Sequence, residues 1–213
     1  MEIKGVITGD IISSMSVKTE WRKMLLDTIQ EIVHELEVLS PLRLEFFRGD
    51  SFQILVDNPV ETLKITVLLR AGLKSRTPKE IEQLWDARMA LGIGSIAYSS
   101  EKVVVSDGDA FHFSGWEFDE LGKRKLSVRT PWKEVNDELK ASTAFADDII
   151  SGWSASQAEV IYLTLLNQES YQKEIATQLN KSAQNVSKLL IAGKESLIHL
   201  YIERFAQIIT INK

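Results

Sequence analysis

The chain has 213 residues, of which 44% are hydrophobic and 26% are charged, and its formal net charge is −5. This composition is typical of a globular protein and excludes a low-complexity or disordered chain. Because there is no cysteine, no signal peptide and no apolar run long enough to span a bilayer, we expect a disulfide-free, soluble, cytoplasmic protein that does not contact a membrane.

The first part of the chain alternates between short apolar runs and helical patterns. Between residues 17 and 38, apolar side chains recur every three or four positions, which is typical of an amphipathic helix. Asn58 and Pro59 form a helix start, and Glu61 is placed to complete a capping box. In chain order we predict a strand over residues 3–7, a helix over 17–38, strands over 42–47 and 51–56, a helix from 58 to about 72, and a strand over 87–97. This βαββαβ order is the ferredoxin-like pattern.

Helical patterns dominate the rest of the chain. A helix is expected over residues 107–121, a strand over 125–129, and helices from Pro131 onward. We therefore predict an α+β fold with a palm-like βαββαβ domain over 1–130, a helical linker over 131–150, and a small all-α domain over 151–213.

Two aspartates mark a candidate metal site in the first part. Asp10 follows the first strand, and Asp50 lies at or near the tip of the hairpin. In a βαββ sheet the first strand lies beside that hairpin, so the two carboxylates are expected to converge. Mg²⁺ is usually bound by one or two carboxylates together with waters and phosphates. The alternative is that both Gly-Asp pairs are turns whose aspartates bond local backbone amides.

Four segments carry a family resemblance: TGDIISS, FFRGDSFQIL, RMALGIGSI and DGDAFHFSG. Together they resemble the SatD-like family of bacterial proteins. Over about residues 1–120 they are also similar to the palm-like domain of class III nucleotide cyclases. That resemblance implies that Asp10 and Asp50 bind Mg²⁺ or Mn²⁺ and that the backbone at Ile11 lies near the phosphates of a nucleotide.

The same resemblance places His112 where the cyclases have a ribose-binding Asn, and Trp116 where they have a transition-state Arg. Histidine can hydrogen-bond a ribose, but tryptophan cannot replace a guanidinium on a developing phosphate charge. The resemblance therefore implies nucleotide binding at His112 without cyclisation, and no residue is assigned a catalytic role.

Residues 172–189 have the spacing of a helix-turn-helix. Ala176 allows two helices to approach closely, Asn180 can adopt the left-handed conformation of the turn, and Ser182 is placed to cap the second helix. Upstream, Ser156 with Glu159 is a candidate capping box for a preceding helix. The arrangement resembles region 4 of sigma factors, which implies that the second helix enters the major groove of DNA. Its candidate DNA-binding residues are Ser182, Ala183, Gln184, Ser187 and Lys188.

Charge limits how this unit can act. Residues 151–213 carry a net charge of +1 and residues 1–150 a net charge of −6. So small an excess does not predict tight DNA binding by a monomer, which makes a homodimer the expected form. The last helix is apolar enough to dock on the first domain or to pair with another subunit.

These features predict a DNA-binding transcriptional regulator with a nucleotide- and Mg²⁺-binding or dimerisation domain. In that interpretation a ligand shifts the DNA-binding helices across a dimer. The alternative is a nucleotidyl cyclase-like or other metal-dependent phosphotransfer enzyme, in which the helical unit serves assembly or protein contacts.

Overall fold

The structure is a computed structural model that describes residues 2–14, 18–47, 49–97, 103, 106–167 and 172–213. Within them the elements are β1 (Ile3–Ile11), α1 (Thr19–Leu36), β2 (Leu42–Phe47), β3 (Ser51–Val56), the short 3₁₀ turn η2 (Pro59–Glu61), α2 (Thr62–Ser75), β4 (Ala87–Ser95), α3 (Asp109–Asp119), β5 (Leu126–Arg129), α4 (Lys133–Ser151), α5 (Ala155–Leu166), α6 (Gln172–Gln178), α7 (Ala183–Ala192) and α8 (Glu195–Asn212). The predicted helix start at residue 17, Arg48 of the hairpin and residues 168–171 lie outside the described parts of the chain.

The predicted βαββαβ order is confirmed. In the described chain the strands form a five-stranded sheet in the order β2-β3-β1-β4-β5. The pairs β2·β3, β3·β1 and β1·β4 are antiparallel, which is the ferredoxin-like arrangement, and β5 adds a parallel edge strand next to β4.

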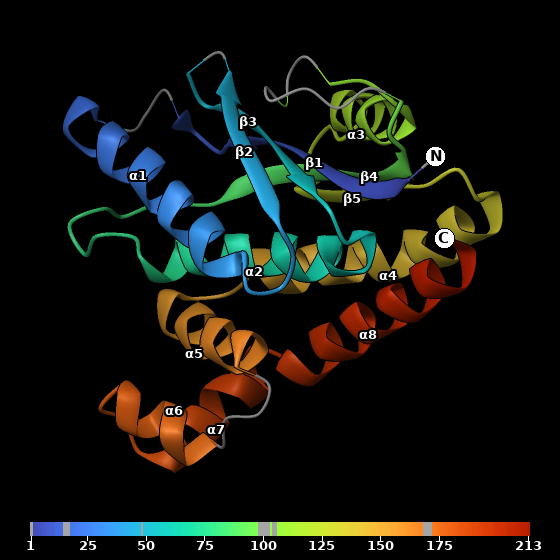
Figure 1. The fold of residues 1–213 in the computed structure, drawn as a ribbon. Helices are drawn as coiled ribbons and strands as arrows, with labels where there is room; N and C mark the ends of the chain where they lie inside the picture. Colours follow the sequence, from blue (N-terminus) through green and yellow to red (C-terminus); the bar gives the residue numbers. More distant parts are fainter. Residues whose placement is uncertain (1, 15–17, 48, 98–102, 104–105, 168–171) are drawn as a thin grey trace.

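Helices cover the two faces of the sheet unequally, as Figure 1 shows. On one face α3 packs against β4 and β1, where the hydroxyls of Thr8 and Ser114 are hydrogen-bonded at 2.9 Å. On the other face α1 and α2 form a layer, and α5 packs on α2 from below. Every residue of α2 from Thr62 to Lys74 is buried, because this helix has neighbours on all sides.

Several predicted boundaries were wrong in detail. β1 continues to Ile11, so Asp10 is the second-to-last residue of the strand and does not follow it. β4 ends at Ser95 and not at residue 97. Asn58 accepts a hydrogen bond from the amide of Val60, but it caps the 3₁₀ turn, and the capping box with Glu61 is not formed. α2 then runs to Ser75 because apolar burial continues past Gly72.

The cap of α5 was also predicted wrongly. Ser154 and Gln157 form the capping box, two residues earlier than the expected Ser156 and Glu159. Ser154 has the extended backbone of a cap residue, whereas Ser156 already lies inside the helix.

The C-terminal helices share one core with the sheet. The same cluster of buried side chains contains Ile7 of β1, Val160 of α5, Val186 of α7 and Phe205 of α8. The last helix, α8, packs against η2 and α4. Docking on the first domain was one of the two possibilities predicted for this helix. The division at residues 130 and 150 stays a prediction from the sequence.

Polar contacts join the same layers. Glu35 of α1 accepts hydrogen bonds from Tyr162 of α5 at 2.5 Å and from Arg76 at 2.6 Å. The described helices include none with the length and apolar character required to cross a membrane.

Candidate functional site

The end of β1 lies beside the β2–β3 hairpin. Asp10 is in register with Ser51 of β3, and the amide of Ile11 donates a hydrogen bond to the carbonyl of Asp50 at 3.3 Å. The backbones of Asp10 and Asp50 are therefore close neighbours at one end of the sheet. This is the juxtaposition that the order of the strands predicted.

Each of the two carboxylates already has a partner in the chain. Asp10 Oδ2 accepts hydrogen bonds from Arg88 Nη2 at 2.7 Å and Nε at 3.2 Å, and Asp50 Oδ2 accepts one from the hydroxyl of Ser14. Arg88 lies directly opposite Asp10 on β4, and its guanidinium stands 5.0 Å from the ring centre of Phe118 in α3. A guanidinium is therefore part of this site.

Sequence reasoning missed Arg88, although a signal was present. It is the one charged residue in the segment 87–97, which is otherwise small and apolar. A charged side chain in such a strand needs a partner on the same face of the sheet, and Asp10 lies directly opposite it on β1.

The chemistry of this end of the sheet fits a hard divalent cation. Asp10, Asp50 and the hydroxyl of Ser14 offer oxygen ligands only, and Asp10 is 20% exposed at its side chain. Among the described residues no group of three or more His, Cys, Asp or Glu side chains forms a metal cage. Two carboxylates suffice for Mg²⁺ when waters and substrate phosphates complete the octahedron, so the residues fit Mg²⁺ or Mn²⁺ and not a structural zinc.

The backbone at Ile11 is engaged within the protein. Its amide bonds to Asp50, its side chain is only 3% exposed, and the next amide, that of Ile12, donates to the carbonyl of Asp86 at 3.0 Å. The predicted contact between this backbone and phosphates therefore requires these amides to leave their present partners.

His112 is not brought to the carboxylate pair. α3 begins at Asp109, which bonds to Ser95 at 2.7 Å, and Phe118 near its end contacts Arg88. His112 therefore lies toward the end of β4 that is opposite to Arg88.

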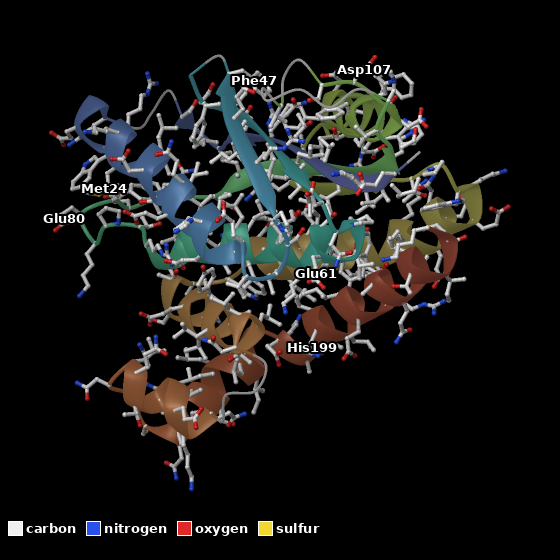
Figure 2. The ribbon with its side chains drawn as sticks, in the orientation of Figure 1. Met24, Phe47, Glu61, Glu80, Asp107 and His199 are labelled. Atoms are coloured by element: carbon white, nitrogen blue, oxygen red, sulfur yellow. The ribbon has the colours of Figure 1, made fainter. Side chains whose placement is uncertain are left out.

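The local partners of His112 explain its position. Its ring lies 2.9 Å from Asp107 Oδ1 and stacks on Trp116 with ring centres 5.6 Å apart. Figure 2 labels Asp107 beside α3 and Phe47 beside the hairpin. A ribose-binding role of His112 stays a prediction, and the described contacts of His112 include none with Asp10 or Asp50.

A pocket of about 400 Å³ opens next to the loop that follows β1. Trp21 of α1 and Trp85 form its aromatic wall, and Gln83 donates a hydrogen bond to Ser13 at 3.2 Å on its rim. Trp85 is 3% exposed, and its indole N–H is buried without a hydrogen-bond partner in the described chain. The remaining lining comes from Ile12, Lys18 and residues 80–84, of which Glu80 is labelled in Figure 2.

A buried ion network lies behind this pocket. Arg70 of α2 is fully buried and bonds to Asp86 through Nε and Nη2, both at 2.8 Å, and to Asp147 of α4 through Nη1 at 2.8 Å. Lys74 and Lys125 add weaker contacts to Asp86 at 3.4 and 3.5 Å. Asp86 lies between Trp85 of the pocket and the start of β4, the strand that carries Arg88. The network therefore holds the backbone beside both the pocket and Arg88 in place.

The turn between α6 and α7 and the cap of α7 are as the sequence predicted, and a separate helix-turn-helix domain stays a prediction. Asn180 has a positive φ of 50°, and Ser182 caps α7 by accepting a hydrogen bond from the amide of Asn185 at 3.2 Å. The buried side chains between the two helices include Ile175, Ala176 and Val186.

The predicted DNA-binding residues lie on the outer side of α7. Ser182, Ala183, Gln184 and Lys188 are exposed, and Ser187 is half-buried. Nearby, Lys181 is paired with Glu159 at 2.7 Å and so contributes less positive charge to this surface. The face is accessible to a partner but weakly basic.

The fold and the site together define an α+β protein with a palm-like sheet and a carboxylate pair at the end of β1. The chain matches the SatD family over residues 5–210 and belongs to that family. No curated protein matches it.

Two solved structures resemble parts of the chain. One is the active GGEEF domain of a diguanylate cyclase from Vibrio cholerae, with 14% identity, a TM-score of 0.42, and coverage of 60% of this chain and 83% of that one. The other is a bacterial light-regulated adenylyl cyclase, with 10% identity, a TM-score of 0.39, and coverage of 59% and 74%.

Proposed function

We propose that this SatD-family protein binds a nucleoside phosphate together with Mg²⁺ or Mn²⁺ at the end of β1 and carries out metal-dependent phosphotransfer there. The observation that carries the proposal is the juxtaposition of Asp10 with Asp50 beside the guanidinium of Arg88. Carboxylates for a cation and a guanidinium for phosphate are the groups that bind a metal–phosphate ligand.

The residues divide the work according to their chemistry. Asp10 and Asp50 hold the cation, which when bound neutralises phosphate charge and polarises a phosphoryl oxygen. Arg88 offers the planar donor fork that recognises phosphate oxygens in pairs. It thereby supplies, from β4, the positive charge that tryptophan at position 116 cannot supply. The pocket beside Trp21 has the aromatic wall on which a nucleobase stacks.

Asp10→Asn and Asp50→Asn are each expected to weaken metal-dependent binding of ATP or GTP by about tenfold or more, because a lost charge-assisted contact of about 1.4 kcal/mol has that effect. Calorimetric titration with Mg²⁺ or Mn²⁺ present, and chromatography of the nucleotide products, measure binding and turnover separately. Asp27→Asn, the same change on the exposed face of α1, is the matched control and should leave both unchanged. If the wild-type protein binds neither ATP nor GTP in the presence of Mg²⁺ or Mn²⁺, the proposal is wrong.

A second candidate function is DNA binding by α7. The observation in its favour is that Gln184 and Lys188 are exposed next to a turn with the left-handed Asn180. Glutamine can pair with adenine edges in the major groove, and lysine can pair with a phosphate.

Lys188→Ala is expected to weaken binding to duplex DNA and to lower the salt dependence of the binding constant by about one unit of slope. Gln184→Ala should reduce preference among sequences more than overall affinity. Gel shifts over a range of salt concentrations, with Gln207→Ala on α8 as the control, test both effects. DNA binding that neither substitution alters would exclude α7 as the contacting helix.

A further inference from the structure

An apolar groove of about 600 Å³ lies between α4 and α8. Its floor contains Leu139, Ile198 and Tyr201, which are at most 6% exposed, and the Tyr201 hydroxyl is hydrogen-bonded to Thr143 at 2.5 Å. The Tyr201 hydroxyl in the floor therefore has a hydrogen-bond partner within the chain and needs none from a ligand.

The rim of this groove is apolar and exposed. Phe145 is 72% exposed, Leu197 53% and Leu200 62%. Large apolar side chains that gather on one surface are characteristic of an interaction site, whereas isolated ones are common. An exposed apolar rim of this kind is suited to contact with another molecule.

The charges beside the groove have a defined pattern. α4 contributes two acids, Glu138 and Asp148, and α8 contributes two bases, Lys194 and Arg204. Figure 1 shows α8 running back along α4 in the opposite direction. Glu138 and Arg204 are paired at 2.7 Å at one end of the groove, so Asp148 and Lys194 lie toward the other end. One side of the groove is acidic and the other is basic.

This pattern is self-complementary for one orientation of a two-fold axis. If the axis runs along the groove, α4 of each copy faces α8 of the other, and each acidic row meets a basic row. If the axis runs across the groove, α4 faces α4 and like charges meet. Closed two-fold pairs are the commonest protein oligomers, and like charges in register oppose association.

We propose that the groove between α4 and α8 is the interface of a homodimer whose two-fold axis runs along it. Phe145 and Leu200 of each copy bury themselves against the partner's rim. In the described chain Asp148 and Lys194 have no ionic partner, and in the dimer each pairs with the opposite residue of the second copy.

The mass in solution gives the first test. Light scattering on wild-type protein is expected to show twice the chain mass of 24.1 kDa. Phe145→Glu and Leu200→Glu should each shift the mass to that of one chain, with an unchanged circular dichroism spectrum because both sites are exposed. Ile191→Glu is the matched control, since Ile191 is 75% exposed on α7 and outside the groove, and it should stay dimeric.

Charge exchange gives the second test. Asp148→Lys and Lys194→Asp should each weaken the homodimer, because like charges then face one another. Aspartate tolerates the left-handed backbone of position 194, where φ is 54°. A mixture of the two variants should form a heterodimer, which is captured through a tag on one chain, because every facing pair is then opposite in sign.

The results that overturn the proposal are distinct. If the wild-type protein stays monomeric at its highest soluble concentration, the homodimer is excluded. The same holds if this monomer binds a different protein through the groove. A dimer that survives both glutamate substitutions must use another surface. Variants that fail to associate when mixed exclude the axis along the groove.

Discussion

Replacing Arg70 by methionine is expected to lower the free energy of unfolding by about 3 to 5 kcal/mol, the cost of removing one partner from a buried ion pair. The guanidinium is fully buried and holds the carboxylates of Asp86 and Asp147. Methionine fills most of the space, but it leaves two buried acids without their main counter-charge. Urea unfolding followed by circular dichroism measures the loss.

Arg76→Met is the matched control, because Arg76 ends the same helix. Its salt bridge to Glu35 has side-chain exposures of 28% and 43%, so solvent screens it and its loss should cost about 1 kcal/mol or less. An equal loss at the two positions would contradict the assignment of Arg70 as the centre of a buried network.

Acid titration gives an independent measure of the same network. Burial alone would raise the pKa of Asp86, but the hydrogen bonds and charge of Arg70, together with Lys74 and Lys125, lower it below its ordinary value of 3.8. The stability that ionised Asp86 contributes is therefore complete above that pH and is lost as the pH falls through the lower folded value. In Arg70→Met this acid-dependent loss should become smaller.

Gly92→Ala is expected to cost about 1 to 3 kcal/mol, the usual range for overpacking, because α3 lies directly on this strand position. A Cβ at Gly92 would overlap the carbonyl oxygen of Ala110 and lie 2.5 Å from the amide nitrogen of Ser114. Both atoms belong to helix backbone, which cannot rotate away as a side chain can. Thermal unfolding of the variant should show the loss.

The same substitution at Gly115 should have the opposite sign. Gly115 lies inside α3, and a Cβ there would meet no atom within 4 Å. Alanine in a helix interior is favoured over glycine by about 1 kcal/mol, so Gly115→Ala is expected to stabilise the protein. Equal effects at the two positions would mean that α3 is not held closely on β4.

Local patterns predicted the fold well. The order βαββαβ followed from the period of the apolar residues, and the antiparallel pairing follows from that order. The left-handed turn at Asn180 and the cap at Ser182 were predicted because both depend on residues a few positions away. Helix ends such as Ser75 were not, because tertiary burial extended the helix.

The site was predicted only where neighbouring strands define it. The backbones of Asp10 and Asp50 are neighbours because a hairpin lies beside the first strand, and the metal site that they are expected to form stays a prediction. Arg88 and the Arg70 network were missed because their partners depend on register between segments that are distant in the sequence. The position of His112 relative to Asp10 was not predicted, because the direction of α3 over the sheet has no local sequence signal.

Helices α6 and α7 are attached to the rest of the molecule at both ends. α5 before them packs on α2, and α8 after them returns to η2 and α4. Packed helices on both sides of the segment oppose a large rotation of α6 and α7. We therefore expect any ligand at the end of β1 that influences α7 to act through small sliding movements of packed helices, in the manner of shear motion. The core that makes this segment stable also restricts it to short movements.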